Sequence, residues 1–307
     1  MLDLGSNSTR LLIAEVTPDG GVTELVRRST VTRLGHRVDA TGRLDEAAMQ
    51  RVMDVLDDYR AMMDAHDVQA ATGVLTAAAR EASNGSAFAA RVAERYDVEV
   101  SVIDGDREAA LTFTGATSAR PADGRRTVVI DVGGGSTEFV VGVDRQADFP
   151  ASTRAGVVRQ TERHLHDDPP TREQLAALRA EAAETFAAAV PADIRTGVEA
   201  GIAVAGTATS CAAMAQGLGR YDGALVHGYR LARATVEDLL ERLGTMPESE
   251  RRHVPGLDPD RAGVIVAGLC LQLEAMLAFD LDEIEVSEHD LLRGAALELA
   301  RSLRPAA

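Results

Sequence analysis

The sequence contains no lysine, so all 32 of its basic residues are arginine. A Walker-type phosphate loop needs a lysine that reaches the β- and γ-phosphates of a nucleotide. Schiff-base catalysis needs the amine of a lysine. Both kinds of site are therefore excluded from this chain. The replacement of lysine by arginine is itself typical of a GC-rich genome and indicates no function.

Cysteine, long apolar runs and net positive charge are also scarce or absent. The two cysteines, Cys211 and Cys270, lie in apolar helical segments, which favours buried thiols and a reducing cytoplasm over a disulfide. No run approaches the ~20 apolar residues of a membrane helix, and no signal-peptide pattern opens the chain, so we expect a cytoplasmic protein without membrane contact. The formal net charge of −16 argues against broad nucleic-acid binding. A polyanionic substrate would need metal ions and a few arginines to make its cleft locally positive.

Two short segments look like copies of one sequence motif: DLGSNST at residues 3–9 and DVGGGST at residues 131–137. Each has an aspartate two residues before a Gly/Ser turn and an apolar run after it, which predicts a strand, a tight turn and a returning strand. Such turns aim several backbone N–H groups into one concavity that binds anions. The aspartate at the mouth can hold a hydrated divalent cation. Two such hairpins facing each other would clamp a chain of phosphates.

Strand and helix signals alternate along the chain, which predicts an α/β fold. At 307 residues the chain suits two domains, and the repeated hairpin indicates two related lobes with a cleft between them. The turn-rich segment 121–124 is the expected boundary. We predict an N-terminal lobe at 1–120, a C-terminal lobe at 125–286, and a last helix at about 289–303 that packs back on the first lobe. Apolar spacing also predicts helices over 105–117 and 258–279.

The first hairpin has too few residues for a full first strand, because only Met1 and Leu2 precede Asp3. We expect that several natural residues are missing from this end. A genuinely short edge strand is the alternative.

Asp131 and Glu138 are the first candidates for a metal site. They stand seven residues apart across the second turn, so a hairpin brings both carboxylates to one side. Oxygen ligands of this kind suit Mg²⁺, which keeps several waters and shares phosphate oxygens. A turn-capping aspartate beside a solvated glutamate is the alternative. Asp3 is the symmetry-related candidate, reaching the metal through water, and a purely structural turn aspartate explains it equally well.

Backbone and hydroxyl donors of both turns would cradle the terminal phosphates. The candidates are Gly5, Ser6, Asn7, Gly133, Gly134, Gly135 and Ser136. Three consecutive glycines permit close backbone approach and exceed what a hairpin requires. Gly206 and Thr207 could add donors at a helix N-terminus, although a tight strand–helix turn explains them nearly as well.

Two histidine segments offer weaker signals. His164 and His166 superficially suggest zinc, but the segment runs into two prolines and is better interpreted as a polar loop. His227 either lines the cleft or is a buried structural histidine.

Eight segments, taken in order, resemble the Ppx/GppA family of exopolyphosphatases and guanosine pentaphosphate phosphatases. They are Asp3-x-Gly5-Ser6-Asn7-Ser8-x-Arg10, Arg33-Leu34-Gly35, Thr76-x-Ala78-x-Arg80-Glu81-Ala82-x-Asn84, Gly105-x-x-Glu108-Ala109, residues 131–138, Gly206-Thr207-Ala208-Thr209, Val226-His227-Gly228 and Val286-Ser287-Glu288. Each alone is weak, but their order and spacing are specific. The resemblance implies two actin-like (ribonuclease H-like) lobes of the sugar kinase/Hsp70/actin superfamily, an interdomain cleft and a homodimer.

The same resemblance implies roles for single residues. It makes Glu108 the catalytic base that polarises the attacking water, although the residues alone are equally consistent with a solvated, acidic helix start. It assigns Mg²⁺, or Mn²⁺, to the metal pair described above. Arg10, Arg33 and Arg80 sit in matching motifs and could pair bidentately with phosphate oxygens, with Arg159 a weaker fourth.

The resemblance also implies the reaction, which is metal-dependent hydrolysis of terminal phosphoanhydride bonds. The substrates would be inorganic polyphosphate and guanosine pentaphosphate. Longer relatives use additional C-terminal helical domains to bind long chains, so we expect short polyphosphate to be favoured. The residues around 287–294 and Gly263 depart from the commoner family pattern. An actin-like ATPase or kinase that binds ATP in the same cleft is the alternative, and a non-catalytic sensor would require the loss of acids that are present.

Overall fold

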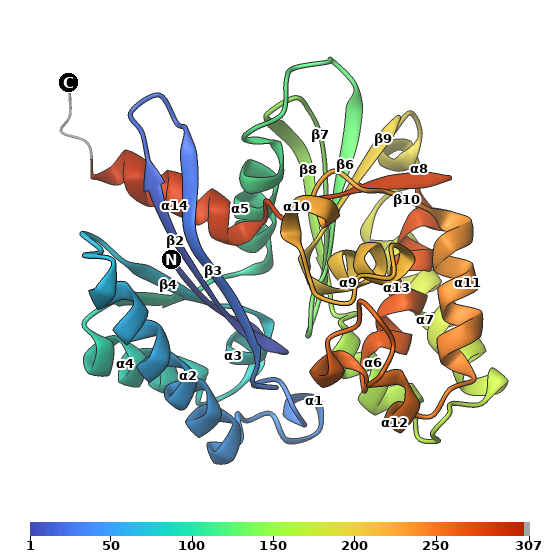
Figure 1. Cartoon of the computed structure of the whole chain (residues 1–307). Coiled ribbons are helices and arrows are strands. Elements are labelled where there is room, and N and C mark those ends of the chain that lie inside the picture. Colours follow the sequence, from blue (N-terminus) through green and yellow to red (C-terminus); the bar gives the residue numbers. More distant parts are fainter. Residues whose placement is uncertain (304–307) are drawn as a thin grey trace.

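Two mixed β-sheets, one from each half of the chain, organise the protein (Figure 1). The computed structural model describes residues 1–303. The first sheet has the strand order β3-β2-β1-β4-β5, with bounds Leu2–Leu4, Ser8–Val16, Val22–Val31, Thr72–Leu75 and Glu99–Val102 for β1 to β5. The second has the order β10-β11-β9-β6-β7-β8, with bounds Arg126–Val132, Thr137–Val143, Gln146–Thr153, Ala200–Val204, Arg230–Ala232 and Glu283–Val286 for β6 to β11.

The two sheets repeat one topology. In each, three consecutive strands form an antiparallel meander, and the first of them is then extended by two parallel strands: β4 and β5 in one sheet, β9 and β11 in the other. Parallel strands need crossover helices, which cover the faces of both sheets. Strand β10 is an additional edge of the second sheet. The predicted α/β class with two related lobes is confirmed.

Fourteen α-helices and one short 3₁₀ turn are assigned within the described residues. Helices α1 to α7 span Val38–Thr41, Glu46–Ala65, Ala77–Glu81, Gly85–Tyr96, Gly105–Thr117, Val157–His164 and Arg172–Ala189. Helices α8 to α14 span Ala192–Arg195, Ala205–Ala215, Gly223–Val226, Arg233–Gly244, Glu248–Arg251, Ile265–Ala278 and Leu291–Ser302. Across residues 1–303, no helix combines the length and the apolar character that spanning a membrane requires.

Strand β1 lies in the middle of its sheet, so the alternative of a short edge strand is wrong. It pairs antiparallel with β2 and parallel with β4, and Leu2 and Leu4 are fully buried. Three residues suffice because both neighbouring strands supply partners for its backbone groups.

The single helix expected over 258–279 is also wrong. Asp258 caps a 3₁₀ turn at Pro259–Arg261, its side chain accepting from the amide of Asp260, and α13 begins only at Ile265. The cap and the proline favour a new helix start rather than a continuing helix. The break matters because Arg261, which ends the 3₁₀ turn, lines the cavity between the lobes instead of lying inside α13.

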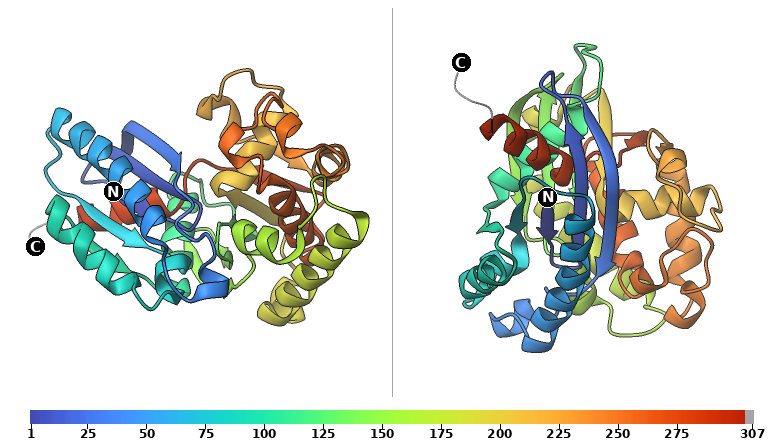
Figure 2. Two further views of the ribbon diagram at one scale, coloured as in Figure 1. Left: turned by 90° about the horizontal axis from the view of Figure 1, so that it is seen from below. Right: turned by 60° about the vertical axis from the view of Figure 1, so that its left-hand side comes forward.

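Helices α5 and α14 connect the lobes (Figure 2). On one side, Leu291 and Leu292 of α14 pack on Leu12 and Val74 of the first sheet. On the other side, α5 packs Phe113 and its neighbours on the second sheet. The division at 1–120 and 125–286 therefore stays a proposal, with α5 shared between the lobes.

The two connecting helices touch backbone to backbone through glycines. A Cβ added at Gly115 of α5 would lie 1.9 Å from the carbonyl oxygen of Asp290, and one added at Gly294 of α14 would lie 1.9 Å from that of Leu111. Neither backbone can move without disturbing a helix, so each position requires glycine for steric reasons.

We expect Gly115→Ala and Gly294→Ala each to lower the free energy of unfolding by about 1–3 kcal/mol through overpacking. Gly219→Ala is the matched control, because no atom lies within 4 Å of its added Cβ. Chemical denaturation of the three variants checks this. Equal stabilities would show that the helices can separate at no cost.

Candidate active site

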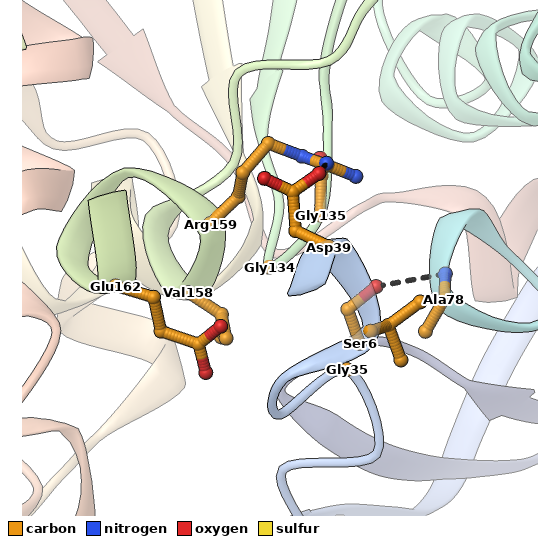
Figure 3. Close-up of a pocket in the computed structure, with 10 residues that line it drawn as sticks. Ser6, Gly35, Asp39, Ala78, Gly134, Gly135, Val158, Arg159 and Glu162 are labelled. Carbon is orange, nitrogen blue, oxygen red and sulfur yellow. Dashed lines mark hydrogen bonds and ion pairs between the residues drawn. The ribbon is translucent and has the colours of Figure 1, made fainter. Parts of the chain in front are cut away.

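The two glycine turns meet at the junction of the lobes (Figure 3). A Cβ added at Gly134 would lie 2.6 Å from the amide nitrogen of Asn7, and one added at Gly135 would lie 2.6 Å from Oγ of Ser6. The cavity beside them measures about 10 Å³, the space of about one water. The hairpins therefore face each other, but in this conformation the expected clamp is closed.

The backbone carbonyl groups of each turn accept hydrogen bonds from segments of the same lobe. In the first turn, Asn7 O accepts from the amides of Thr32 and Arg33 at 3.0 and 2.9 Å, and Ser6 O accepts from Gly35 at 2.7 Å. These bonds pin the turn from its outer side.

The second turn is held in the same way by the start of α6. The carbonyls of Gly133 and Gly134 accept from Val157 and Val158, both at 2.9 Å. A Cβ at Gly156 would lie 2.3 Å from the carbonyl carbon of Gly135, so α6 presses directly on the turn.

The amides of both turns are left free as a result. Within residues 1–303, the backbone N–H groups of Ser6, Asn7, Gly134, Gly135 and Ser136 donate to no other part of the chain. The buried side-chain amide of Asn7 also lacks a partner there. Such a concentration of unpaired donors is what an anion-binding nest provides.

Three carboxylates are buried next to these turns. Asp131 and Glu138 are cross-strand partners in the hairpin, so both lie on one face of it, and Glu138 is only 1% exposed. Glu108 lies in the first turn of α5 and accepts from Nη1 of Arg80 at 3.1 Å. Arg80 also donates to the carbonyl of Ile103, which fixes its position.

The acidity of the cluster is strongly perturbed. Burial raises the pKa of Glu108 and of Asp131 to about 7, although Arg80 opposes the shift at Glu108 and Arg10 opposes it at Asp131. Burial, together with the charges of Glu108 and Asp131, raises the pKa of Glu138 well above its usual range. The nearby arginines therefore supply too little positive charge to keep all three carboxyl groups ionised at neutral pH.

Asp3 occupies the equivalent position in the first hairpin but has a different environment. Its Oδ2 accepts from Nε of Arg10 at 2.6 Å, while its buried Oδ1 has no partner among the described residues. Arg10 is held on its other side by Asp290, the N-cap of α14, at 2.5 Å. Asp3 is thus an anchor for Arg10 that keeps one oxygen unused.

These oxygen donors fit a hydrated magnesium or manganese ion rather than a fully enclosed metal. In the part of the chain that the structure describes, no three acidic, histidine or cysteine side chains converge closely enough to hold an ion by themselves. Carboxylates that bind together with water and phosphate oxygens are the usual arrangement for Mg²⁺. His164 and His166 belong to no such group of three among the described residues. Nε2 of His164 lies 2.9 Å from Oε2 of Glu181, which also argues against zinc there.

The structure separates the predicted arginines. Arg80 lies at the carboxylates, and Arg10 lies between Asp3 and Asp290. Arg33 is on the exposed rim, where Nη2 donates across the lobes to the carbonyl of Asp260 at 3.3 Å.

Arg261 was not predicted, and it lies where a phosphate was expected. A Cβ at Gly206 would be 1.8 Å from Nη1 of Arg261, so the guanidinium covers this helix start. It bonds only weakly to Ser8 and Ser29, both at 3.5 Å, and has no carboxylate partner within residues 1–303. Thr207 instead donates to the carbonyl of Val132 at 3.3 Å. The single helix expected over 258–279 would have placed Arg261 inside regular helix, so no signal in the sequence indicated it at this site.

Two larger cavities adjoin the site. One of about 900 Å³ lies between the lobes and is lined by Arg10, Arg261, Tyr221, His227 and Asp290, among others. His227 is exposed here and stacks on His289, with ring centroids 4.3 Å apart, so the alternative of a buried structural histidine is wrong. The other cavity, of about 560 Å³, is lined by residues that include Arg80, Gly105, Ser136 and Ser152.

An ion network crosses the lobes beside the turns. Its members are Asp39 and Glu81 from the first half and Arg154, Arg159 and Arg163 from the second. Arg159 is only 6% exposed, pairs with both acids, and its Nε donates to the carbonyl of Gly135 at 3.3 Å. The predicted phosphate ligand Arg159 is therefore engaged in holding the lobes together.

Two nests of free amides beside buried carboxylates are the arrangement expected of a protein that binds phosphate groups. The model of the Ppx/GppA phosphatase family matches residues 12–302. Exopolyphosphatase 2 of Mycobacterium tuberculosis is 36% identical over 314 residues, which cover 97% of each chain.

Solved structures agree with this assignment. The crystal structure of an exopolyphosphatase-like protein matches with a TM-score of 0.91 at 33% identity, over 99% of this chain and 98% of that one. The Aquifex aeolicus member of the Ppx/GppA family matches with a TM-score of 0.81 at 29% identity, over the same shares. The chain belongs to the Ppx/GppA phosphatase family, and its two-lobed α/β fold is that of the family's solved members.

The raised carboxyl pKa values predict a stability that depends on pH. Asp131 titrates near its usual 3.8 when unfolded and at about 7 when folded, so its contribution is full below about pH 4 and is lost as the pH rises through 7. In metal chelator at pH 7.5, we expect Asp131→Asn to be more stable than wild type by on the order of 3 kcal/mol. The difference should shrink at pH 4.5. The exposed Asp148→Asn serves as the control, and an unchanged difference between the two pH values would contradict the assignment.

The ion network predicts the consequence of removing its central residue. Arg159→Gln removes a buried guanidinium from the exposed Asp39 and the partly buried Glu81. We therefore expect the free energy of unfolding to fall by about 1–3 kcal/mol and the radius of gyration in X-ray scattering to increase. Arg95→Gln breaks an exposed pair with Asp57 inside the first lobe and should change neither quantity measurably. If Arg159→Gln behaves like Arg95→Gln, the network does not hold the lobes together.

Proposed function

We propose that this protein hydrolyses terminal phosphoanhydride bonds and releases phosphate from inorganic polyphosphate, with short chains favoured. The observation that carries this is the group of Glu108, Asp131 and Glu138 buried beside two turns with unpaired amides. The names of the curated relatives, exopolyphosphatases 1 and 2, support the choice of substrate.

Asp131 and Glu138 are the residues that would hold Mg²⁺, or Mn²⁺, and the free Oδ1 of Asp3 could reach it through water. When bound, the ion would neutralise charge on the phosphate oxygens. The free amides of the two turns, with the Ser6 and Ser136 hydroxyls, would bind the terminal phosphate. Because the turns touch in this conformation, the lobes must separate to admit it.

Glu108 would act as the base for the attacking water. A carboxyl group with a pKa of about 7 accepts a proton near neutral pH far better than an ordinary glutamate. Arg80 holds one of its oxygens at 3.1 Å and can bind phosphate oxygens on its remaining donors. Arg261, which lacks a carboxylate partner in the described chain, is a further candidate for a phosphate ligand.

The cavity of about 900 Å³ supports a preference for short chains. Two of its arginines are already paired, Arg10 with Asp3 and Asp290, and Arg27 with Glu24 and Asp290. A long polyanion would need a more uniformly positive path. The aromatic faces of Tyr221 and the paired histidines would suit a base, which keeps guanosine pentaphosphate as a second substrate and ATP hydrolysis as the alternative function. A cytoplasmic location and a homodimer are further proposals from the family.

Glu108→Gln tests the function directly. We expect it to lower kcat on short polyphosphate with Mg²⁺ by about 10²–10⁴-fold, because only the proton acceptor is lost, with little change in KM. Phosphate release should be measured on tripolyphosphate, long polyphosphate, guanosine pentaphosphate and ATP. The exposed Glu94→Gln is the control.

A wild-type protein that releases nothing from polyphosphate or guanosine pentaphosphate would overturn the proposal. Turnover of ATP alone would favour the actin-like ATPase. Full activity of Glu108→Gln would remove only the assignment of the base.

A further inference from the structure

Ser152 stands where three elements of the site meet. It lies on β8 directly across from Glu138 on β7, and its hydroxyl donates to Oε1 of Glu138 at 2.7 Å. Glu138 is almost completely buried, so few donors can reach it, and this bond fixes one of its two oxygens.

The first residue of α5 rests on the same serine. A Cβ added at Gly105 would lie 2.5 Å from Cβ and 2.7 Å from Oγ of Ser152. The backbone of Gly105 has no left-handed φ, so the requirement for glycine is steric. Glu108 follows three residues later on this helix, in its first turn.

We propose that Ser152 is a positioning residue that orients Glu138 for a divalent cation, and that Gly105 sets the spacing between Glu108 and that site. The inference rests on the proposed function. Partners that hydrogen-bond to metal-binding carboxylates orient them, and their loss weakens metal binding. Ser152 is itself exposed on the wall of the cavity of about 560 Å³, so its substitution does not open a hole in the core.

The test measures Mn²⁺ binding by electron paramagnetic resonance, without substrate. We expect Ser152→Ala to weaken Mn²⁺ binding by about 10–100-fold. Ser152→Cys, which keeps a weaker donor of similar size, should fall between. Thr153→Val is the matched control, because the Thr153 hydroxyl donates to the carbonyl of Thr137 at 3.0 Å and contacts no carboxylate.

Gly105→Ala tests the second half of the proposal. The added methyl pushes α5 away from Ser152, so we expect kcat to fall by about 10²-fold while Mn²⁺ affinity stays within about threefold of wild type. Gly219→Ala controls for the loss of glycine flexibility. The split between the two readouts separates displacement of Glu108 from damage to the metal site.

The outcomes distinguish this inference from the proposed function. Wild-type Mn²⁺ affinity in Ser152→Ala overturns the role of Ser152, whatever the activity. Wild-type kcat in Gly105→Ala overturns the role of Gly105. A wild-type protein that hydrolyses polyphosphate without binding Mn²⁺ overturns the inference and leaves the hydrolase. A wild-type protein that binds Mn²⁺ but hydrolyses no phosphoanhydride overturns the proposed function. In that case the Mn²⁺ affinity of Ser152→Ala relative to wild type still tests the role of Ser152.

Discussion

The cost of burying negative charge is the constraint on which this structure depends. Glu108, Asp131 and Glu138 are removed from water together, and within residues 1–303 Arg80 is the one guanidinium bonded to any of them. Ionised carboxylates are stable in such surroundings only when they are paired, so the site favours protonation or the arrival of a cation. The extensive apolar cores of both lobes offset this cost. A site that is unfavourable when empty is suited to recruiting an ion together with its substrate.

The contacts between the lobes are of two kinds. At α5 and α14 the backbones touch through Gly115 and Gly294, a steric contact that cannot loosen without breaking the packing. At the turns the lobes are joined by the close approach of Gly134 to Asn7 and by the ion network around Arg159. Polar contacts exchange readily with water and with anions. The lobes are therefore held by steric packing at the glycines and by charge pairing at the turns.

Several elements could be predicted because their signals are local. The hairpins follow from the glycine turns between apolar runs, and α5 was expected over the range observed, Gly105–Thr117. Prediction was wrong where local patterns compete. Apolar spacing over 258–279 concealed the cap at Asp258. The shortness of β1 left an edge strand as an alternative, because its parallel partner β4 lies far along the chain. Ser152 carries no motif, and the helix expected over 258–279 concealed the break that brings Arg261 to the cleft.

The sequence by itself determined the chemistry that is possible here. Without lysine it excluded a Walker loop, and the alternation of a strand placed Asp131 and Glu138 on one face of one hairpin. Only the tertiary structure decided that Glu108 joins them, that Arg159 binds the lobes together, and that Arg261 covers Gly206. The physical reason is separation along the chain. Strand and turn geometry act over a few residues, whereas burial and charge pairing depend on which distant segments the packed cores bring together.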